Sequence, residues 1–542
     1  MNRNNFIISI ISMLLSAFVW FGCSDDQFTE KYNDPSTVSS VTIQKLFTGQ
    51  LMQSREHFCA IYHRYFAFDS QNMGRWAQTF GSSGGSRWAP GYQAYMDDNW
   101  GRFYRTAKHF KKLEDLYLEL SEEDKKTEEA WYMAGKVAIY AYLVANLDLY
   151  GDMPWTEAGK ISLTGIIEDA HSQYDKAEDV YKLIIDDLKT VGLRFAPSSG
   201  MTKPAIFNSS QDYINDGDFE KWQRFANSIR LRAALRVASN GSITAVGQAA
   251  IKEILENPAT YPVVEDFDQN IIVKNRRLDP LNLQPAQGMS DAGWSGSKES
   301  SAALIKRMRD GDWRLNIVYT LATESAANPE YTVYRGRGPE TTDEESSNLG
   351  ANGYSKVRQG GFFWHNDLWD HQIYSSPETW FIKAEAYLNG WASGDAEDAF
   401  KNAVRESIEF YFYYQEHRIR WGTGYWGDIM NYYIDPERPS VAEIEEFADR
   451  KWNSDDYENK LDAIITQKWV NFGILYVREA WNEIRRTGYP SGMLWPKGSD
   501  GIVFEYVPTR WRYPVSEINY NKYYETVKDR DTYWTKLFWA KP

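Results

Sequence analysis

The chain has 542 residues and a formal net charge of −15 at pH 7, with no long run of basic residues. Both features argue against nucleic acid as a partner, because binding to phosphates needs clustered Lys and Arg. Aromatic residues make up 15% of the chain, including 22 Trp and 36 Tyr. A core of Leu, Ile and Val does not need so many rings, so some of them are expected to work at a surface.

A secretory signal is predicted at the N-terminus. Arg3 provides a basic start, and residues 6–21 are apolar apart from small Ser residues. This run is too short for a comfortable membrane span, so residues 1–22 are predicted to be a cleaved signal peptide. Cys23 follows directly and is the predicted lipid anchor of a bacterial lipoprotein, with an ordinary signal and an incidental Cys as the alternative. Ser24-Asp25-Asp26 resembles the signal that sends some lipoproteins to the outer face of the outer membrane.

The mature chain, residues 23–542, is predicted to be a single body that is only tethered to the membrane. It contains no apolar run of 18 residues and no Gly/Ser-rich or Pro-rich linker. Its length also allows three domains, at roughly 100–200 residues each. Once Cys23 is acylated, Cys59 is the only thiol, which excludes an intramolecular disulfide and favours a buried filler role.

Helical periodicity dominates the chain. Residues 128–150 carry large and small side chains at three- and four-residue spacing, and Gly151 is the expected cap at the end of this helix. Ser376-Pro377-Glu378 is typical of a helix start, with Ser as N-cap and Glu at the positive end of the helix dipole. This helix is predicted to end at Asn389-Gly390, and a second one is predicted over residues 396–411.

The spacing of these helices is similar to that of tetratricopeptide repeats. The pair at 376–411 matches best, and two further pairs are predicted, 128–150 with 174–188 and 219–237 with 245–255. A generic helical bundle remains the alternative. The predicted fold is therefore mainly α, with helical repeats at about 40–257 and 376–542. Two Gly-, Asn- and Ser-rich stretches, about 69–99 and 258–375, are predicted to be loop-rich insertions, and long loops of this kind are usually functional.

Five sequence blocks resemble the SusD/RagB family of outer-membrane nutrient-binding lipoproteins, and together they span nearly the whole mature chain. In chain order they are Tyr-Gly-Asp-Met-Pro-Trp at 150–155, Trp-Gln-Arg-Phe-Ala-Asn at 222–227, the Ala-Glu-Ala helix at 380–390, and the C-terminal blocks at 466–490 and 508–521. Asp312-Trp313-Arg314 departs from the usual Asp-Pro-Arg of the family, which we interpret as a variation in a local turn.

The resemblance implies a helical body on tetratricopeptide-like units, with an irregular part that carries the ligand surface. It also implies that the protein captures oligosaccharides, or alternatively peptides, and passes them to a TonB-dependent barrel of the SusC type. The quoted blocks are then mostly scaffold, and Asn227, Arg230 and Arg232 are expected to pack helices or to face the barrel. No cofactor is implied.

Aromatic residues on the loops are the candidate ligand contacts, because a sugar ring can lie flat on an indole or a phenol at a gain of about 1 kcal/mol, by analogy with aromatic pairs. Trp76, Trp88, Trp294 and Trp364 are predicted to form one solvent-facing platform, since large exposed rings usually mark interaction surfaces. The full set of candidates, including polar residues for sugar hydroxyls, is Trp76, Trp88, Tyr92, Trp294, Arg358, Trp364, Asn366, Asp367 and Trp369. Structural packing is the competing interpretation for each of them.

Catalysis is not predicted. The acidic pairs Asp97/Asp98 and Asp343/Glu344 are of a kind that any chain with 75 acidic residues contains, so they do not indicate a glycosidase. His365 and His371 lack the spacing of a metal site. The segment 215–218, Asn-Asp-Gly-Asp, hints at calcium but is better explained as a helix cap. A third possibility is a protein-interaction scaffold without a small ligand, which would leave the aromatic loops unexplained.

Overall fold

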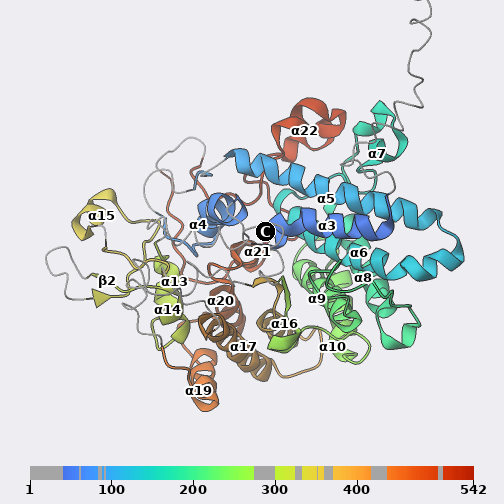
Figure 1. Ribbon diagram of the computed structural model, residues 1–542. Coiled ribbons are helices and arrows are strands. Elements are labelled where there is room, and N and C mark those ends of the chain that lie inside the picture. Colours follow the sequence, from blue (N-terminus) through green and yellow to red (C-terminus); the bar gives the residue numbers. More distant parts are fainter. Residues whose placement is uncertain are drawn as a thin grey trace, which may run out of the picture.

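The computed structural model describes residues 41–59, 63–82, 88–90, 93–273, 299–323, 332–350, 352–358, 370–416, 436–498 and 504–542. Helices dominate these ranges and the strands are short (Figure 1). The mainly α fold predicted from the sequence is confirmed. Every helix within the described ranges is too short or too polar to span a bilayer.

The long helices pack as successive pairs, which gives the molecule its repeat-like body. α6 packs against α8, α9 against α10, and α16 against α17, so all three predicted pairs are confirmed. Another pair, α3 with α5, precedes them in the chain. The bounds of these helices are α3 (Ile43–Phe58), α5 (Gln93–Glu119), α6 (Glu122–Tyr150), α8 (Ala177–Arg194), α9 (Phe219–Ala238), α10 (Thr244–Glu256), α16 (Ser376–Leu388) and α17 (Ala396–Glu416).

The predicted helix ends are partly confirmed. Gly151 ends α6 at φ +76°, and its N–H donates to the carbonyl of Leu147 at 2.9 Å. At the start of α16 the prediction is wrong by one residue, because Ser376 lies inside the helix and donates its hydroxyl to Glu406 at 2.7 Å. Glu378 lies in the first turn of α16, as predicted, and its carboxylate also forms an ion pair with Arg232 of α9 at 2.6 Å.

The segment 69–99 is more helical than predicted. A helical stretch, η1 (His63–Met73), runs directly into α4 (Gly74–Trp76), and α5 begins at Gln93. Burial of Phe68, Met73 and Trp76 explains the difference, since packing against α21 (Val477–Thr487) stabilises a helix that the sequence periodicity does not reveal.

The described parts of the segment 258–375 contain only short helices and strands, and its elements α13, α14, α15 and β2 lie at the left of the view in Figure 1. Strand β1 pairs antiparallel with β4, and β2 with β3. The elements of this segment are η4 (Phe267–Gln269), β1 (Ile271–Val273), α13 (Ala302–Met308), α14 (Trp313–Val318), β2 (Ala322–Thr323), β3 (Thr332–Val333), α15 (Asp343–Leu349) and β4 (His371–Tyr374).

The C-terminal part departs from the prediction of helical repeats up to residue 542. Helices α19 (Val441–Trp452), α20 (Lys460–Phe472) and α21 continue the helical body. The described residues after α21, 488–498 and 504–542, contain only the short α22 (Val515–Tyr520) and two 3-10 turns. This last segment folds back onto the rest of the chain: Trp511 donates its backbone N–H to the carbonyl of Leu149 at 2.8 Å.

The Tyr-Gly-Asp turn after α6 acts as scaffold. Asp152 accepts the backbone N–H of Ala177, at the start of α8, at 2.9 Å. It also pairs with Arg530 at 2.7 Å, and its carbonyl accepts the hydroxyl of Tyr513 at 2.5 Å. The turn therefore joins α6 and α8 to the C-terminal segment.

Several smaller predictions are confirmed. Asp218 caps α9 by accepting the backbone N–H groups of Glu220 and Lys221. Cys59 is fully buried, and burial raises the pKa of its thiol to about 12, which keeps it inert. Arg230 joins α9 to α8, since it donates to the carbonyl of Ile185 at 3.0 Å. Asn227 donates to the carbonyl of Pro262, in the segment after α10, at 2.9 Å.

Candidate ligand-binding site

A pocket of about 260 Å³ lies between α21 and the C-terminal segment. Helix α21 supplies Trp481, Ile484 and Arg485, which lie three and four residues apart and therefore on one face. The lining residues are Trp76, Trp481, Ile484, Arg485, Gly488, Trp495, Val507, Pro508, Thr509, Lys536, Ala540, Lys541 and Pro542. The pocket combines apolar walls, an exposed indole and cationic groups.

Gly488 has two structural reasons to stand at the end of α21. Its φ of +79° is a conformation that side chains disfavour. A Cβ atom at this position would also come within 2.9 Å of Nζ of Lys541. Glycine therefore both ends the helix and leaves room for the lysine at the edge of the pocket.

Trp495 is the exposed ring of the pocket. Its side chain is 41% exposed, and its ring centroid lies 5.9 Å from that of the fully buried Trp88. Trp88 donates its Nε1–H to the carbonyl of Pro496 at 3.0 Å, and Trp76 donates its own to the carbonyl of Trp88 at 2.9 Å. The two buried indoles thus hold the loop that presents Trp495.

The prediction of a solvent-facing platform is wrong for Trp76 and Trp88, because both side chains are 0% exposed. Each buried indole N–H has a carbonyl partner, and Trp76 also packs on Trp481 with ring centroids 5.2 Å apart. Arg358 was expected to meet sugar hydroxyls, but it is only 2% exposed and donates to the carbonyl of Asn316 at 3.2 Å. Burial places Trp88 and Arg358 in the packing of the loops, whereas the buried ring of Trp76 lines the pocket.

The other candidates fall outside the described residues. These are the anchor Cys23 and the candidate ligand contacts Tyr92, Trp294, Trp364, Asn366, Asp367 and Trp369. His365 also lies outside them, and its suggested partner His371 is buried in β4. Within the parts of the chain that the structure describes, no group of three or more His, Cys, Asp and Glu side chains gathers as metal ligands would.

Sequence reasoning missed Trp481, Arg485 and Trp495. Trp481 and Arg485 belong to a family-like block that was read as scaffold. A usable signal existed for Trp495, because it stands in Ser491-Gly492-Met493-Leu494-Trp495-Pro496, which has the same Gly- and Pro-containing character as the loops that were chosen.

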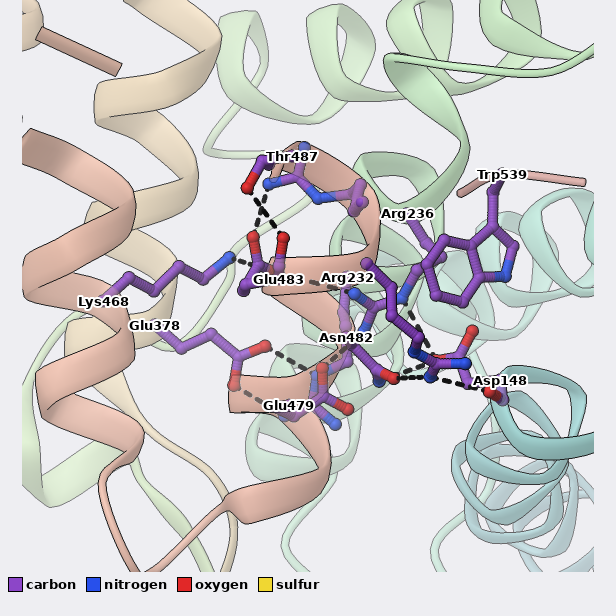
Figure 2. Close-up of polar contacts among 12 residues, drawn as sticks. Asp148, Arg232, Arg236, Glu378, Lys468, Glu479, Asn482, Glu483, Thr487 and Trp539 are labelled. Carbon is purple, nitrogen blue, oxygen red and sulfur yellow. Dashed lines mark hydrogen bonds and ion pairs between the residues drawn. The ribbon is translucent and has the colours of Figure 1, made fainter. Parts of the chain in front are cut away.

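A buried network of charged side chains supports the opposite face of α21 (Figure 2). Arg236 of α9 pairs with Asp148 of α6 at 3.1 Å and with Glu479 of α21. Asn482 of α21 donates to the same Asp148 carboxylate at 3.1 Å. Because three helices share these contacts, the network sets the position of α21 relative to the helix pairs.

Glu483 is the centre of the second half of this network (Figure 2). Its carboxylate, 1% exposed, pairs with Lys468 of α20 at 3.0 Å and with Arg486 at 2.5 Å. Arg486 also pairs with Glu385 of α16 at 2.6 Å. Burial opposes ionisation of Glu483, but the cations of Arg486, Lys468 and Arg236 outweigh it and lower the pKa of this carboxyl to about 2.

A smaller polar cavity of about 50 Å³ lies on the other side of α21, near Arg478 and Glu479. His57 of α3 lines it and stacks on Tyr142 with ring centroids 4.1 Å apart. Burial lowers the pKa of His57 well below its usual value, and the cations of Arg478 and Arg64 add to the effect. A neutral imidazole can accept a hydrogen bond from Arg478, whose Nη1 lies 3.4 Å from Nδ1 of His57. This cavity is small and its charges are paired, so it favours a structural role.

Comparison with known proteins assigns the chain to a family. Residues 35–514 match the model of the SusD-like family, which is described as starch-binding and associating with the outer membrane. The chain belongs to the SusD-like family. The resemblance noted from five sequence blocks is thereby confirmed, and the match covers most of the chain.

Solved structures share the fold of this SusD-like protein. A chitin-binding protein is 22% identical, with 92% of this chain and 100% of that chain covered and a TM-score of 0.71. A SusD homolog from Bacteroides fragilis NCTC 9343 is 20% identical over 92% and 99% of the two chains, with a TM-score of 0.68. A chitin-binding SusD homolog from Flavobacterium johnsoniae is 19% identical over 91% and 98%, with a TM-score of 0.62. None of the curated proteins compared with the chain matches it significantly. At these identities the structures establish the fold alone.

Proposed function

We propose that this SusD-like protein binds oligosaccharides at the cell surface, without catalysis, and passes them to a SusC-type TonB-dependent transporter. The observation that carries the proposal is the pocket in which Trp495 is exposed on a base of buried indoles. A flat exposed ring with rigid support suits the apolar face of a sugar, because little side-chain entropy is lost on binding. The family description and the chitin-binding structural relatives support a glycan as ligand.

Replacing Trp495 with alanine is expected to weaken glycan binding by roughly ten-fold or more, which corresponds to about 1.4 kcal/mol. Isothermal titration calorimetry with a glycan first identified on an array measures the effect. Tyr520→Ala is the matched control, because this ring is 75% exposed on α22 and does not line the pocket. Undiminished affinity in Trp495→Ala would exclude this pocket as the binding site. Binding of peptides but not of glycans would favour the alternative ligand class.

Delivery to a transporter is the second part of the proposal. A binding protein on the cell surface has no means to move its ligand inward, so it needs a membrane-spanning partner. Affinity purification of the lipoprotein from mildly solubilised membranes is expected to recover a TonB-dependent barrel of larger mass. Recovery of the lipoprotein alone, under conditions that preserve other membrane complexes, would contradict the proposed partnership.

Attachment to the outer membrane is proposed to occur through Cys23, and the lipid is expected to face the cell exterior. The support is the apolar stretch at 6–21 followed by Gly22-Cys23, together with the outer-membrane association in the family description. Acyl chains contribute about 0.8 kcal/mol per buried methylene, so two or more chains anchor a protein stably.

A further inference from the structure

Three of the side chains that line the aromatic pocket are cationic. Arg485, Lys536 and Lys541 contribute to the wall, and none of the described lining residues is Asp or Glu. The chain as a whole has 75 acidic and 60 basic residues. The charged side chains of the pocket are therefore positive although the molecule as a whole is negatively charged, and this local charge favours an anionic ligand.

The two lysines at the mouth of the pocket are available to a ligand. Both side chains are exposed, and within the described part of the chain neither forms an ion pair with a carboxylate. The ammonium group of Lys541 lies over the ring of Tyr489, 5.5 Å from its centroid. Lys497, on the adjacent loop, differs in this respect because it pairs with Glu505 at 2.5 Å. Lysines that already have an acidic partner lose part of their attraction for an incoming anion, whereas Lys536 and Lys541 keep it.

Arg485 adds a cation at the base of the pocket. It is 8% exposed and lies between two indoles, 3.6 Å from the ring centroid of Trp481 and 4.9 Å from that of Trp539. Its guanidinium donates to the carbonyls of Thr509 and Asp148 at 2.9 and 2.8 Å and to the side-chain oxygen of Asn482. Among the described residues no carboxylate pairs with it, so its hydrogen bonds are to neutral oxygens.

This environment is costly for a cation. Burial lowers the pKa of Arg485 to about 9, because moving a charge out of water is unfavourable unless an opposite charge compensates it. Its Nε atom is buried without a hydrogen-bond partner. An anion in the pocket would offset part of this cost through the low-dielectric interior, where charges interact more strongly than in water. The carboxylates of Asp148 and Glu479 act in the opposite direction and raise the pKa of Arg485, but by less than burial lowers it.

We propose that the pocket selects a glycan that carries an anionic group, either the carboxylate of a uronic acid or a sulfate ester. Its sugar ring lies against Trp495, and its anionic group meets Lys536 and Lys541 above Arg485. This inference rests on the proposed function and specifies the ligand class. At about 260 Å³ the pocket is slightly smaller than typical ligand sites of about 300–1,000 Å³, so it suits one or two rings of a longer chain.

The test compares ligands that differ only in charge. The lipoprotein in detergent is titrated with trigalacturonate and with its methyl ester, which has the same ring skeleton without the charges, and with a sulfated oligosaccharide and its desulfated form. The charged member of at least one pair is expected to bind ten-fold or more tightly than the neutral one. Raising the salt from about 50 to 500 mM is expected to reduce that preference, because screening weakens exposed charges.

Variants then connect the preference to this pocket. In the double variant Lys536→Gln/Lys541→Gln the ratio of charged to neutral affinity is expected to fall to near one. Lys497→Gln is the matched control and is expected to keep the ratio of the parent. A preference for carboxylate over sulfate, or the reverse, identifies the source of the anion. Melting temperatures of all variants exclude loss of the fold as the cause.

The outcomes separate this inference from the proposed function. If neutral glycans bind as tightly as charged ones and Trp495→Ala still weakens binding, the anionic ligand class is wrong and the glycan pocket stands. If the charge preference persists in the double lysine variant, the location is wrong. If no glycan of either kind binds and an acidic peptide does, both the inference and the choice of glycans are overturned.

Discussion

Replacing Glu483 with alanine is expected to lower the free energy of unfolding by about 3–5 kcal/mol, the cost of breaking a buried ion pair. The substitution leaves Lys468 and Arg486 buried in the network of Figure 2 without the carboxylate between them. Urea unfolding followed by circular dichroism measures the change. Glu446→Ala is the matched control. The Glu446 side chain is 73% exposed, and its ion pair with Arg450 is therefore expected to contribute less than about 1 kcal/mol.

The contribution of Glu483 to the free energy of unfolding is expected to depend on pH. Its folded pKa of about 2 lies below the ordinary value of 4.5, so the carboxylate stabilises the fold fully above about pH 4.5. That contribution is lost as the pH falls from 4.5 towards 2, and it amounts to about 3 kcal/mol at about 1.4 kcal/mol per pKa unit. The difference in stability between parent and variant should therefore be constant at pH 5–7 and should shrink below pH 4.5. Equal stability of the two proteins at pH 7 would contradict the role assigned to this network.

Replacing Cys23 with alanine is expected to remove the lipid anchor almost completely. Acylation needs the Cys23 thiol, and the remaining chain contains no described helix able to cross a bilayer. Growth with a clickable palmitate analogue should label the parent protein and leave the variant unlabelled, with the variant missing from the outer-membrane fraction. Ser24→Ala is the control, since it keeps the thiol and should still be labelled. Equal labelling and equal fractionation of Cys23→Ala and parent would refute lipidation at this position.

The network and the pocket share α21, which has consequences for variants of either site. Asn482, Glu483 and Arg486 face the buried charges, while Trp481 and Arg485 face the pocket. Substitutions in the network are therefore expected to move the floor of the pocket as well as to lower stability. A loss of ligand affinity in Glu483→Ala is therefore expected to accompany its loss of stability, without any contact between Glu483 and the ligand.

The sequence by itself determined the helices and the family. The long helices of the pairs α6/α8, α9/α10 and α16/α17 could be predicted because helical periodicity, the cap at Gly151 and the start at Asp395 act within a few residues of the chain. The family blocks were equally readable, since each is a short contiguous pattern. Such local signals do not depend on how distant segments meet.

Only the tertiary structure decided which rings face solvent and where the charges gather. Trp88 is buried because a distant loop covers it. Its indole N–H donates to the carbonyl of Pro496, which lies 408 positions further along the chain. The same distant loop leaves Trp495 exposed, although both residues stand in loops of similar composition. The cationic lining likewise arises when Lys536 and Lys541 fold back beside Arg485. Burial and electrostatics are properties of what lies nearby in space, and no spacing along the chain encodes these long-range approaches.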